Sequence, residues 1–170
     1  PKTPRRQRQM CIRDRDISIS KNKPQETFEQ NVVSTINILK LCLKYKIRKF
    51  LYASTVYVHS NKGFFYQASK QCAEIYIKEF NRTNKLNYTI IRFGSLYGPR
   101  SGKNNGLYQL IEKILKKNVI EVNDLESKRE YIHVIDAAKA SVTLLNKKFD
   151  NQSIVAVSYT HLRAHETAMY

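Results

Sequence analysis

Short apolar segments alternate with longer amphipathic segments through the middle of this chain. The apolar segments have the length of strands and no polar face, which is typical of parallel strands covered on both sides. The longer segments repeat apolar residues at helical spacing. We expect helices at 26–44, 65–81, 107–117 and 136–146, strands at 49–54, 87–93, 119–122, 131–134 and 153–156, a loop over 94–105 and a turn over 124–128. This alternation predicts an α/β fold with a parallel sheet.

The two ends of the chain carry segments that one DNA sequence and its reverse complement can encode. Residues 10–14 can be written ATG TGT ATA AGA GAC, and the reverse complement, GTC TCT TAT ACA CAT, encodes residues 157–161. This resembles the transposon-end adapter of sequencing libraries, translated by accident; the alternative is a pair of genuine basic tails. We expect a disordered, adapter-like segment at 1–15, the folded part at 16–156 and a second adapter-like segment at 157–170.

The charge, the cysteines and the length of the apolar runs indicate which partners to expect. The formal charge of +16 falls to +11 over 16–156, once six Lys/Arg and one Asp in front and one Arg and one Glu behind are left out. The lysines are scattered and form no groove-reading motif, so we expect no nucleic-acid partner. Cys42 and Cys72 lack metal-ligand spacing, which favours buried thiols, no metal site and a reducing, cytoplasmic compartment. No apolar run reaches the roughly 18 residues of a membrane span, so we expect no membrane partner.

Polar residues gather where the expected strands end. Ser54 and Thr55 close the first strand, and a loop from Arg92 to Arg100 follows the second. A turn over 129–136 lies near another strand end. Open parallel sheets bind their ligands beyond the carboxyl ends of the strands, so this edge is the predicted site.

Tyr66 and Lys70 lie four residues apart on one expected helix and therefore share a face. A free phenol has a pKa of about 10, too high for an acid or base at neutral pH. A neighbouring ammonium group favours the phenolate and lowers that pKa. A hydroxyl at a strand end, such as that of Ser54, can hydrogen-bond a substrate oxygen as its charge changes. Alone, the Tyr-Lys pair is more typical of a helix surface than of a catalytic site.

Five segments in this order resemble the NAD-dependent epimerase/dehydratase family, the extended short-chain dehydrogenases that act on nucleotide sugars. The segments are Asn31–Leu39, Phe50–Tyr57, Tyr66–Lys70, Ile91–Arg100 and Arg129–Ala138. The resemblance spans about Ser18 to Val155. It implies a Rossmann-like, doubly wound parallel sheet. The sheet would be truncated here, without the N-terminal half of the nucleotide-binding domain and without the C-terminal end.

The resemblance implies a catalytic and cofactor-binding set. Tyr66 would be the acid/base, and Lys70 would lower the pKa of Tyr66 and hold the nicotinamide ribose. Ser54 would hydrogen-bond the reacting hydroxyl or keto group, with Thr55 as the fallback. Asn31 would pack near the active site beside the cofactor.

The resemblance also places arginines along the cofactor and substrate. Arg92 would lie at the cofactor site, and Arg100 ends a segment that leads from it toward the sugar. Arg129 would bind the substrate's diphosphate, since a planar fork suits phosphate oxygens. We interpret His133, Val134 and Asp136 as structural and His59 as a surface residue.

Two departures from the family pattern matter. The glycine-rich phosphate loop is absent from the sequence, as is the acidic residue that would hold the adenosine ribose. The cofactor is therefore NAD or NADP, and the sequence does not distinguish them. Ser54 and Tyr66 are only twelve residues apart, a shorter connection than the family usually has. That spacing puts the choice between Ser54 and Thr55 in doubt and suggests a tighter lid over the sugar.

The resulting hypothesis is a fragment of an NAD(P)-dependent nucleotide-sugar epimerase, dehydratase or reductase with a Ser/Thr-Tyr-Lys site. The parent would be a homodimer through the helix that carries Tyr66 and Lys70, and the fragment would be inactive. One alternative is a non-catalytic dinucleotide-binding homologue, against which the intact Tyr66, Lys70 and Ser54 argue. Another is a basic nucleic-acid-binding module, motivated only by the charge.

We expect removal of 1–15 and 157–170 to leave the melting temperature unchanged or higher. The front segment has five arginines and one lysine with little periodic apolar content, so it cannot bury enough surface to offset its ordering entropy. Thermal melts of the trimmed and untrimmed chains test this. A clearly lower melting temperature after trimming would identify the ends as genuine structure.

Overall fold

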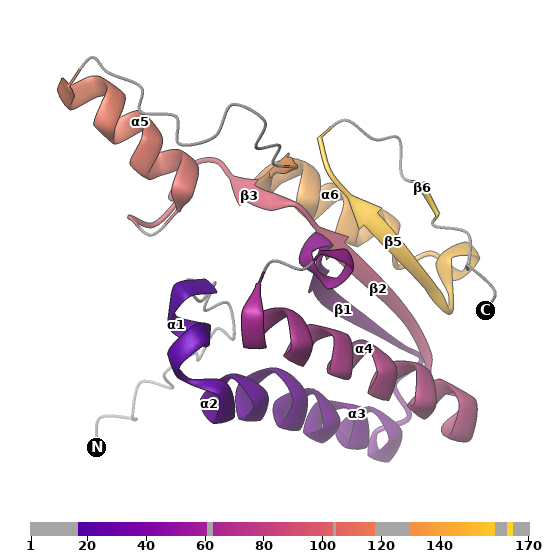
Figure 1. Ribbon diagram of the computed structural model, residues 1–170. Coiled ribbons are helices and arrows are strands. Elements are labelled where there is room, and N and C mark those ends of the chain that lie inside the picture. Colours follow the sequence, from indigo (N-terminus) through magenta and orange to yellow (C-terminus); the bar gives the residue numbers. More distant parts are fainter. Residues whose placement is uncertain (1–16, 61–62, 104, 118–129, 159–162, 165–170) are drawn as a thin grey trace, which may run out of the picture.

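The chain forms a mainly parallel sheet with helices on both faces (Figure 1). The computed structural model describes residues 17–60, 63–103, 105–117, 130–158 and 163–164. The main sheet has the order β1-β2-β5-β6, in which β1 (Lys49–Thr55), β2 (Asn87–Phe93) and β5 (Gln152–Ala156) run parallel. The predicted α/β class and parallel sheet are confirmed.

One face of the sheet is covered by the long helix α4 (Phe64–Asn84) and by α3 (Ser34–Lys44), which lies alongside it (Figure 1). Two short helices, α1 (Ile17–Asn22) and α2 (Pro24–Phe28), precede α3. Pro24 occupies the first turn of α2, where a missing N–H costs nothing. Between α2 and α3, residues 29–33 form a π-helix, η1, so the predicted helix is continuous but widened at Asn31.

The opposite face is covered by α6 (Val134–Thr143), which starts directly after a three-residue strand, β4 (Tyr131–His133). Strand β4 pairs in parallel with β3 (Ser95–Tyr97) in a separate two-stranded sheet. Helix α5 (Gly106–Lys117) extends away from the body beyond β3 (Figure 1).

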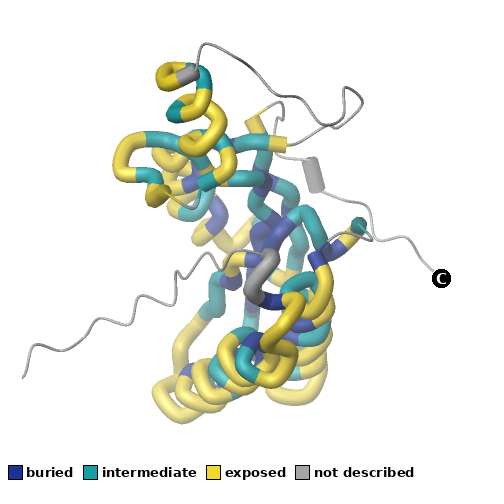
Figure 2. Tube along the Cα trace, turned by 60° about the vertical axis from the view of Figure 1, so that its left-hand side comes forward, coloured by how far each residue is buried: buried dark blue, intermediate teal, exposed yellow. Residues whose placement is uncertain are grey.

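Side chains of the central strand β2 alternate between two apolar cores, one on each face of the sheet. The buried residues lie along the sheet and the inner sides of the helices (Figure 2). The core under α3 and α4 contains Leu39, Cys42, Tyr52, Ala73, Ile77, Leu86, Tyr88 and Ile90. The core under α6 contains Ile91, Ile132, Ala137, Leu144, Ile154 and Ala156. Among the described helices, none has the length and apolar character needed to cross a bilayer.

The structure departs from the sequence-based expectations at several points. The expected loop over 94–105 contains the short strand β3, which the sequence did not reveal because its partner β4 is distant in sequence. Helical spacing predicts that Tyr76 belongs to the same buried stripe of α4 as Ser69 and Ala73, but Tyr76 is exposed. The buried positions of α4 are Ser69, Ala73, Glu74 and Ile77. Cys72 is only half-buried. The strand predicted at 119–122 and the turn at 124–128 lie outside the described residues.

The expectation that residues after Ala156 stand apart from the fold is wrong in part. Arg163–Ala164 forms β6, which pairs antiparallel with Ile154 and Val155 of β5. The backbone N–H of Ser158 also donates to the carbonyl of Tyr131 at 2.6 Å. An edge strand presents unpaired N–H and C=O groups, and any extended segment can pair with them. The pairing of β6 with β5 therefore needs no specific sequence in β6.

Candidate active site

The predicted site edge is formed where β1 and β2 end together. Ser54 lies opposite Arg92 in the parallel register, and Thr55 lies opposite Phe93. Beyond β2, the N–H of Ser95 donates to the carbonyl of Glu130 at 2.7 Å, and this contact leads into the β3–β4 pair. The described parts of the three polar segments thus lie near one another at the carboxyl ends of the strands.

Tyr66 and Lys70 lie on consecutive turns of α4, above the end of β1. Both are half-buried. The Lys70 Nζ donates to the backbone carbonyl of Ala53 at 2.9 Å and lies 5.8 Å from the centroid of the Tyr66 ring. It is nearer still to the ring of Tyr52, at 4.8 Å. The ammonium group is thus held beside the Tyr66 phenol by the strand that ends in Ser54 and Thr55.

Asn31 braces the same turn of α4 from the π-helix. Its side-chain amide donates to the Ser69 hydroxyl at 2.8 Å, and that hydroxyl donates to the backbone carbonyl of Tyr66 at 2.8 Å. The carbonyl of Asn31 accepts from the Thr35 hydroxyl at 2.7 Å. The widened turn of η1 therefore places Asn31 against the helix turn that carries the predicted catalytic pair, and Ser69 links the two.

A buried ion pair that the sequence analysis missed lies directly beneath this turn. The Glu74 carboxylate accepts from the Arg92 guanidinium at 2.6 and 3.1 Å, and the two side chains are only 6% and 9% exposed. The Ser54 hydroxyl donates to the same carboxylate at 2.6 Å. Two sequence features signal this network: an arginine inside an apolar strand, and an acidic residue four positions beyond Lys70 on the same helix face.

This network changes how two predicted site residues are understood. The guanidinium of Arg92 faces the interior and is bound to Glu74, so Arg92 supports the site from beneath. The hydroxyl proton of Ser54 is directed to Glu74. Thr55 is buried and accepts from the Tyr57 N–H at 3.3 Å, which caps the short 3₁₀ helix η2 (Val56–His59). Helix η2 is fixed to α4 by Gln71, whose amide donates to the Val58 carbonyl at 2.7 Å.

Arg129 and Arg100 are the residues predicted to reach the substrate. Arg129 lies outside the described residues. Arg100 is exposed, with a backbone φ of 68°. His133 caps α6 by accepting from the Ile135 N–H at 3.4 Å and packs edge-on against Tyr97 at 5.2 Å, which agrees with a structural role. Gly98 has a φ of 141°, and a Cβ there would lie 2.7 Å from Val134, so only glycine fits.

Burial shifts the proton affinity of several groups around the site. It raises the pKa of Tyr52 well above the ordinary value and raises the pKa of Tyr88 to a lesser degree, because desolvation disfavours the phenolate. It also raises the pKa of the Cys42 thiol. Tyr52 and Tyr88 therefore remain neutral at physiological pH. Within the described residues, His, Cys, Asp and Glu form no cluster suited to a metal.

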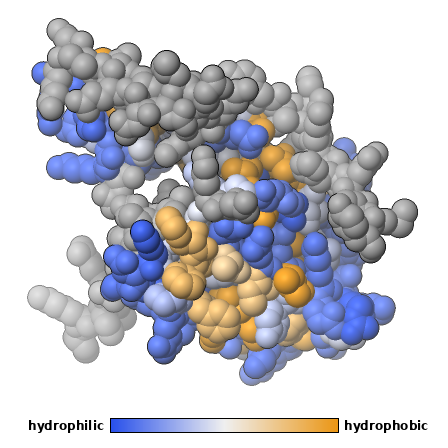
Figure 3. Space-filling model, in the orientation of Figure 1, coloured by the Kyte–Doolittle hydropathy of each residue, from blue (hydrophilic) through white to orange (hydrophobic). Residues whose placement is uncertain are grey.

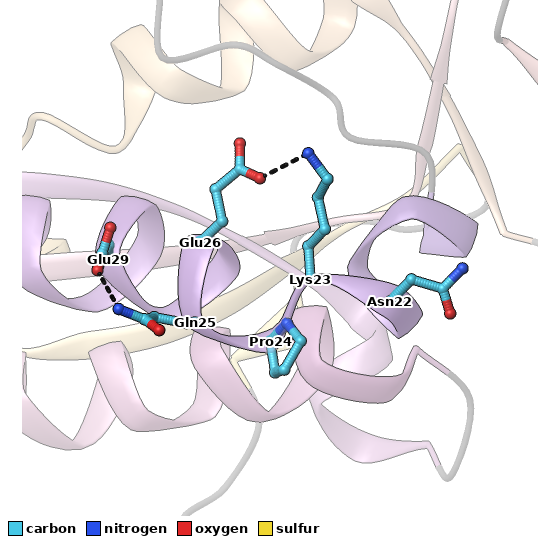
Figure 4. Close-up of a pocket in the computed structure, with 6 residues that line it drawn as sticks. All are labelled: Asn22, Lys23, Pro24, Gln25, Glu26 and Glu29. Carbon is cyan, nitrogen blue, oxygen red and sulfur yellow. Dashed lines mark hydrogen bonds and ion pairs between the residues drawn. The ribbon is translucent and has the colours of Figure 1, made fainter.

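Two open hollows lie away from the Tyr66–Lys70 pair. One, of about 440 Å³, lies where α1 meets α2 (Figure 4). Its side chains pair with one another: Lys23 with Glu26 at 3.0 Å and Gln25 with Glu29 at 3.0 Å. The second, of about 290 Å³, lies between β3 and the start of α5 and includes Tyr97, Tyr108 and His133. Neither contains a predicted catalytic residue.

The chain is similar to nucleotide-sugar enzymes in sequence and structure. The model of the NAD dependent epimerase/dehydratase family matches residues 14–157. A putative UDP-glucose 4-epimerase of Methanocaldococcus jannaschii is 35% identical over 69% of this chain and 45% of its own length. The structure of a UDP-glucose 4-epimerase from Thermotoga maritima with UDP-glucose is similar with a TM-score of 0.74, at 26% identity over 85% of this chain and 52% of that one.

The fold also matches a UDP-glucose 4-epimerase of Thermus thermophilus in complex with NAD, with a TM-score of 0.70, at 24% identity over 86% of this chain and 55% of that one. The chain thus spans about half the length of the proteins it matches.

The buried pair predicts a large difference between two glutamates of α4. Glu74→Ala leaves the guanidinium of Arg92 buried without a counter-charge, so the free energy of unfolding should fall by about 3–5 kcal/mol. Glu79→Ala is the matched control, because Glu79 pairs with Arg82 on the solvent side of the same helix; it should cost far less, since an exposed ion pair contributes little to stability. Urea unfolding measures both, and equal losses would show that the Glu74 pair is not structurally important.

Proposed function

The chain belongs to the NAD dependent epimerase/dehydratase family, and on that premise we propose that the complete protein is an NAD(P)-dependent epimerase, dehydratase or reductase of nucleotide sugars. One observation carries the proposal. The Lys70 ammonium is fixed to the Ala53 carbonyl, beside the Tyr66 ring, at the end of the strand that supplies Ser54 and Thr55. A protein that only bound a dinucleotide would have no use for a phenol placed next to a fixed positive charge.

The chemistry that these residues serve is proton transfer at a sugar hydroxyl. A bound nicotinamide supplies the hydride acceptor. Tyr66 accepts the proton of the hydroxyl group as the carbon–oxygen bond becomes a carbonyl, and it returns a proton in the reverse direction. Lys70 makes this possible near neutral pH because its positive charge stabilises the phenolate.

The residues present fit one half of a dinucleotide site. Tyr66, Lys70 and Asn31 would face the nicotinamide end, with Asn31 holding its place through Ser69. The sequence contains five glycines and no G-x-G-x-x-G segment, so the fixed backbone donors for the pyrophosphate would come from elsewhere. We therefore expect the 170-residue chain alone to bind the cofactor weakly and to be inactive.

The substrate that we propose is a nucleoside-diphosphate sugar. UDP-glucose is named for the Methanocaldococcus relative and for both solved epimerases, which makes it the first substrate to test. Arg129 and Arg100 remain the proposed contacts to the substrate's phosphates, because a guanidinium can offer two parallel donors to phosphate oxygens.

We further propose that the complete protein is a homodimer. Apolar side chains gather over α2, α3 and α4 on the side seen in Figure 3. The exposed ones on these helices include Phe28, Leu41, Phe65 and Tyr76. A contiguous apolar face of this kind is more typical of an interface than of free surface. The mass of the complete protein in solution tests this.

Tyr66→Phe should nearly abolish turnover in the complete protein while cofactor binding survives. The ring and its packing remain, and only the transferable proton is lost, so kcat should fall by about 10²–10⁴-fold. Lys70→Met should weaken both steps, since it removes the charge next to the phenol and the proposed contact to the ribose. Turnover of UDP-glucose and NAD(H) titration measure the two effects. Retention of more than about a tenth of the wild-type rate in Tyr66→Phe excludes Tyr66 as the acid/base.

Between the two strand-end hydroxyls, we now propose Thr55 as the group that hydrogen-bonds the substrate oxygen. Ser54 gives its proton to Glu74, whereas among the described residues the Thr55 side-chain oxygen has one hydrogen bond, which it accepts from the Tyr57 N–H at 3.3 Å. The Thr55 proton therefore remains the more available donor.

Thr55→Val should lower kcat by about 10²–10³-fold, the usual effect of losing one such donor, and Thr55→Ser should restore most of it. Ser54→Ala should mainly lower stability, by about 1–3 kcal/mol, because it leaves the buried carboxylate with one donor fewer. Steady-state kinetics and melting curves of the three variants distinguish the roles. A large loss of kcat in Ser54→Ala with a small one in Thr55→Val would assign the role to Ser54 instead.

A further inference from the structure

Tyr52 lies at the centre of the site but has no place in the proposed reaction so far. It is the fourth residue of β1, 7% exposed, and belongs to the core beneath α3 and α4. Within the described part of the chain, its hydroxyl has no hydrogen-bond partner of ordinary geometry, although Thr35 lies beside it. The Lys70 ammonium lies over the face of the Tyr52 ring, 4.8 Å from the ring centroid.

This contact is well suited to hold a lysine. The Lys70 side chain has a flexible four-carbon stem and loses considerable rotamer entropy when its end is fixed. Two adjacent residues of β1 fix it here: Ala53 accepts a hydrogen bond at 2.9 Å, and Tyr52 presents the negative face of an aromatic ring. A cation within about 6 Å of a ring centroid is attracted by the ring quadrupole, and more strongly where water is excluded.

We propose that Tyr52 is a positioning residue, whose ring holds the Lys70 ammonium against the Tyr66 phenol and so sets the pH range over which Tyr66 can exchange a proton. The inference rests on the proposed roles of Tyr66 and Lys70 and adds a residue to them. Tyr52 itself transfers no proton.

The neighbouring charges leave this role to Tyr52. Arg92 from β2 and Glu74 from α4 are paired with each other, so their charges largely cancel. Cys72 is the other titratable group of α4 near the Tyr52 phenol, and Lys21 of α1 lies over the Phe64 ring. Asn31 and Ser69, which approach from η1 and α4, are uncharged. Burial raises the pKa of Tyr52, so its ring stays neutral and does not compete with Tyr66 for the proton.

The direction of the effect follows from the charge. Without the ring, the Lys70 ammonium can move away from Tyr66, the phenolate loses stabilisation, and the pKa of Tyr66 rises. The size of this rise depends on how far the ammonium group moves from the phenol, because the attraction between the two charges falls with their separation. The acidic limb of the pH–rate profile should move to higher pH by the same amount.

The experiment compares two variants of Tyr52 with a matched control. Tyr52→Phe keeps the ring and should titrate as the wild type. Tyr52→Leu removes the ring and should raise the Tyr66 midpoint. Tyr88→Leu removes another buried tyrosine of the same core. Within the described residues no lysine ammonium lies over the Tyr88 ring, so this variant should lower stability without moving the midpoint.

Two readouts are needed. Ultraviolet titration of tyrosinate in the 170-residue chain, taken as the difference from the same variant with Tyr66→Phe added, isolates the Tyr66 signal without cofactor or turnover. The pH dependence of kcat in the complete protein gives the second. If Tyr52→Leu does not fold, a ring-fluorinated phenylalanine at position 52 weakens the quadrupole while keeping the shape, and it should raise the midpoint in the same direction.

An unchanged Tyr66 midpoint in Tyr52→Leu or in the fluorinated variant overturns the proposal, as does an equal shift in Tyr88→Leu. These outcomes are separate from failure of the proposed function. If Tyr66→Phe leaves turnover intact, the reaction assigned to Tyr66 is wrong, whether or not the Tyr66 midpoint depends on Tyr52.

Discussion

The ion pair between Glu74 and Arg92 fixes the geometry on which the candidate site depends. It joins α4 to β2, and the Ser54 hydroxyl adds β1 to the same carboxylate. A buried charge that loses its partner costs several kcal/mol, so α4 cannot slide or rotate over the sheet without a large penalty. Lys70 and Tyr66 lie one and two turns before Glu74 on the same helix face. The buried Glu74–Arg92 ion pair therefore sets the position of Tyr66 and Lys70, the proposed catalytic pair.

The other contacts restrain the same turn from different directions. Asn31 reaches it through Ser69 from the π-helix, and Ala53 holds the ammonium of Lys70 from the strand. Each of these bonds alone contributes modestly to stability. Because they act on one helix turn from a strand and from a neighbouring helix, the orientation of the phenol is restrained more strongly than any single bond could achieve. Such restraint is what proton transfer requires, since it tolerates little misplacement.

Periodicity in the sequence predicted most helices and strands, because their residues bury one face or both faces of a regular element. The rule that parallel strands end at one edge also predicted that Ser54 and the segment beginning at Arg92 lie at that edge, and the structure pairs Ser54 with Arg92 there. The short strand β3 was missed, since three residues carry no period and their pairing with β4 is distant in sequence. Glu74 was missed for a different reason: a single acid on a helix usually faces water, and only its partner on β2 shows that this one does not.

The acid–base half of the site is self-contained within the described residues. Tyr66 is influenced by Lys70, and Lys70 by Tyr52 and Ala53, none of which needs a bound cofactor to take its place. The pyrophosphate, by contrast, requires backbone donors that this sequence does not contain. Under the proposed function, binding of the dinucleotide and control of the proton affinity of the phenol would therefore depend on different stretches of chain. If Tyr66 acts as proposed, its proton affinity would depend on the contacts between β1 and α4, and it should be measurable in the 170-residue chain without substrate.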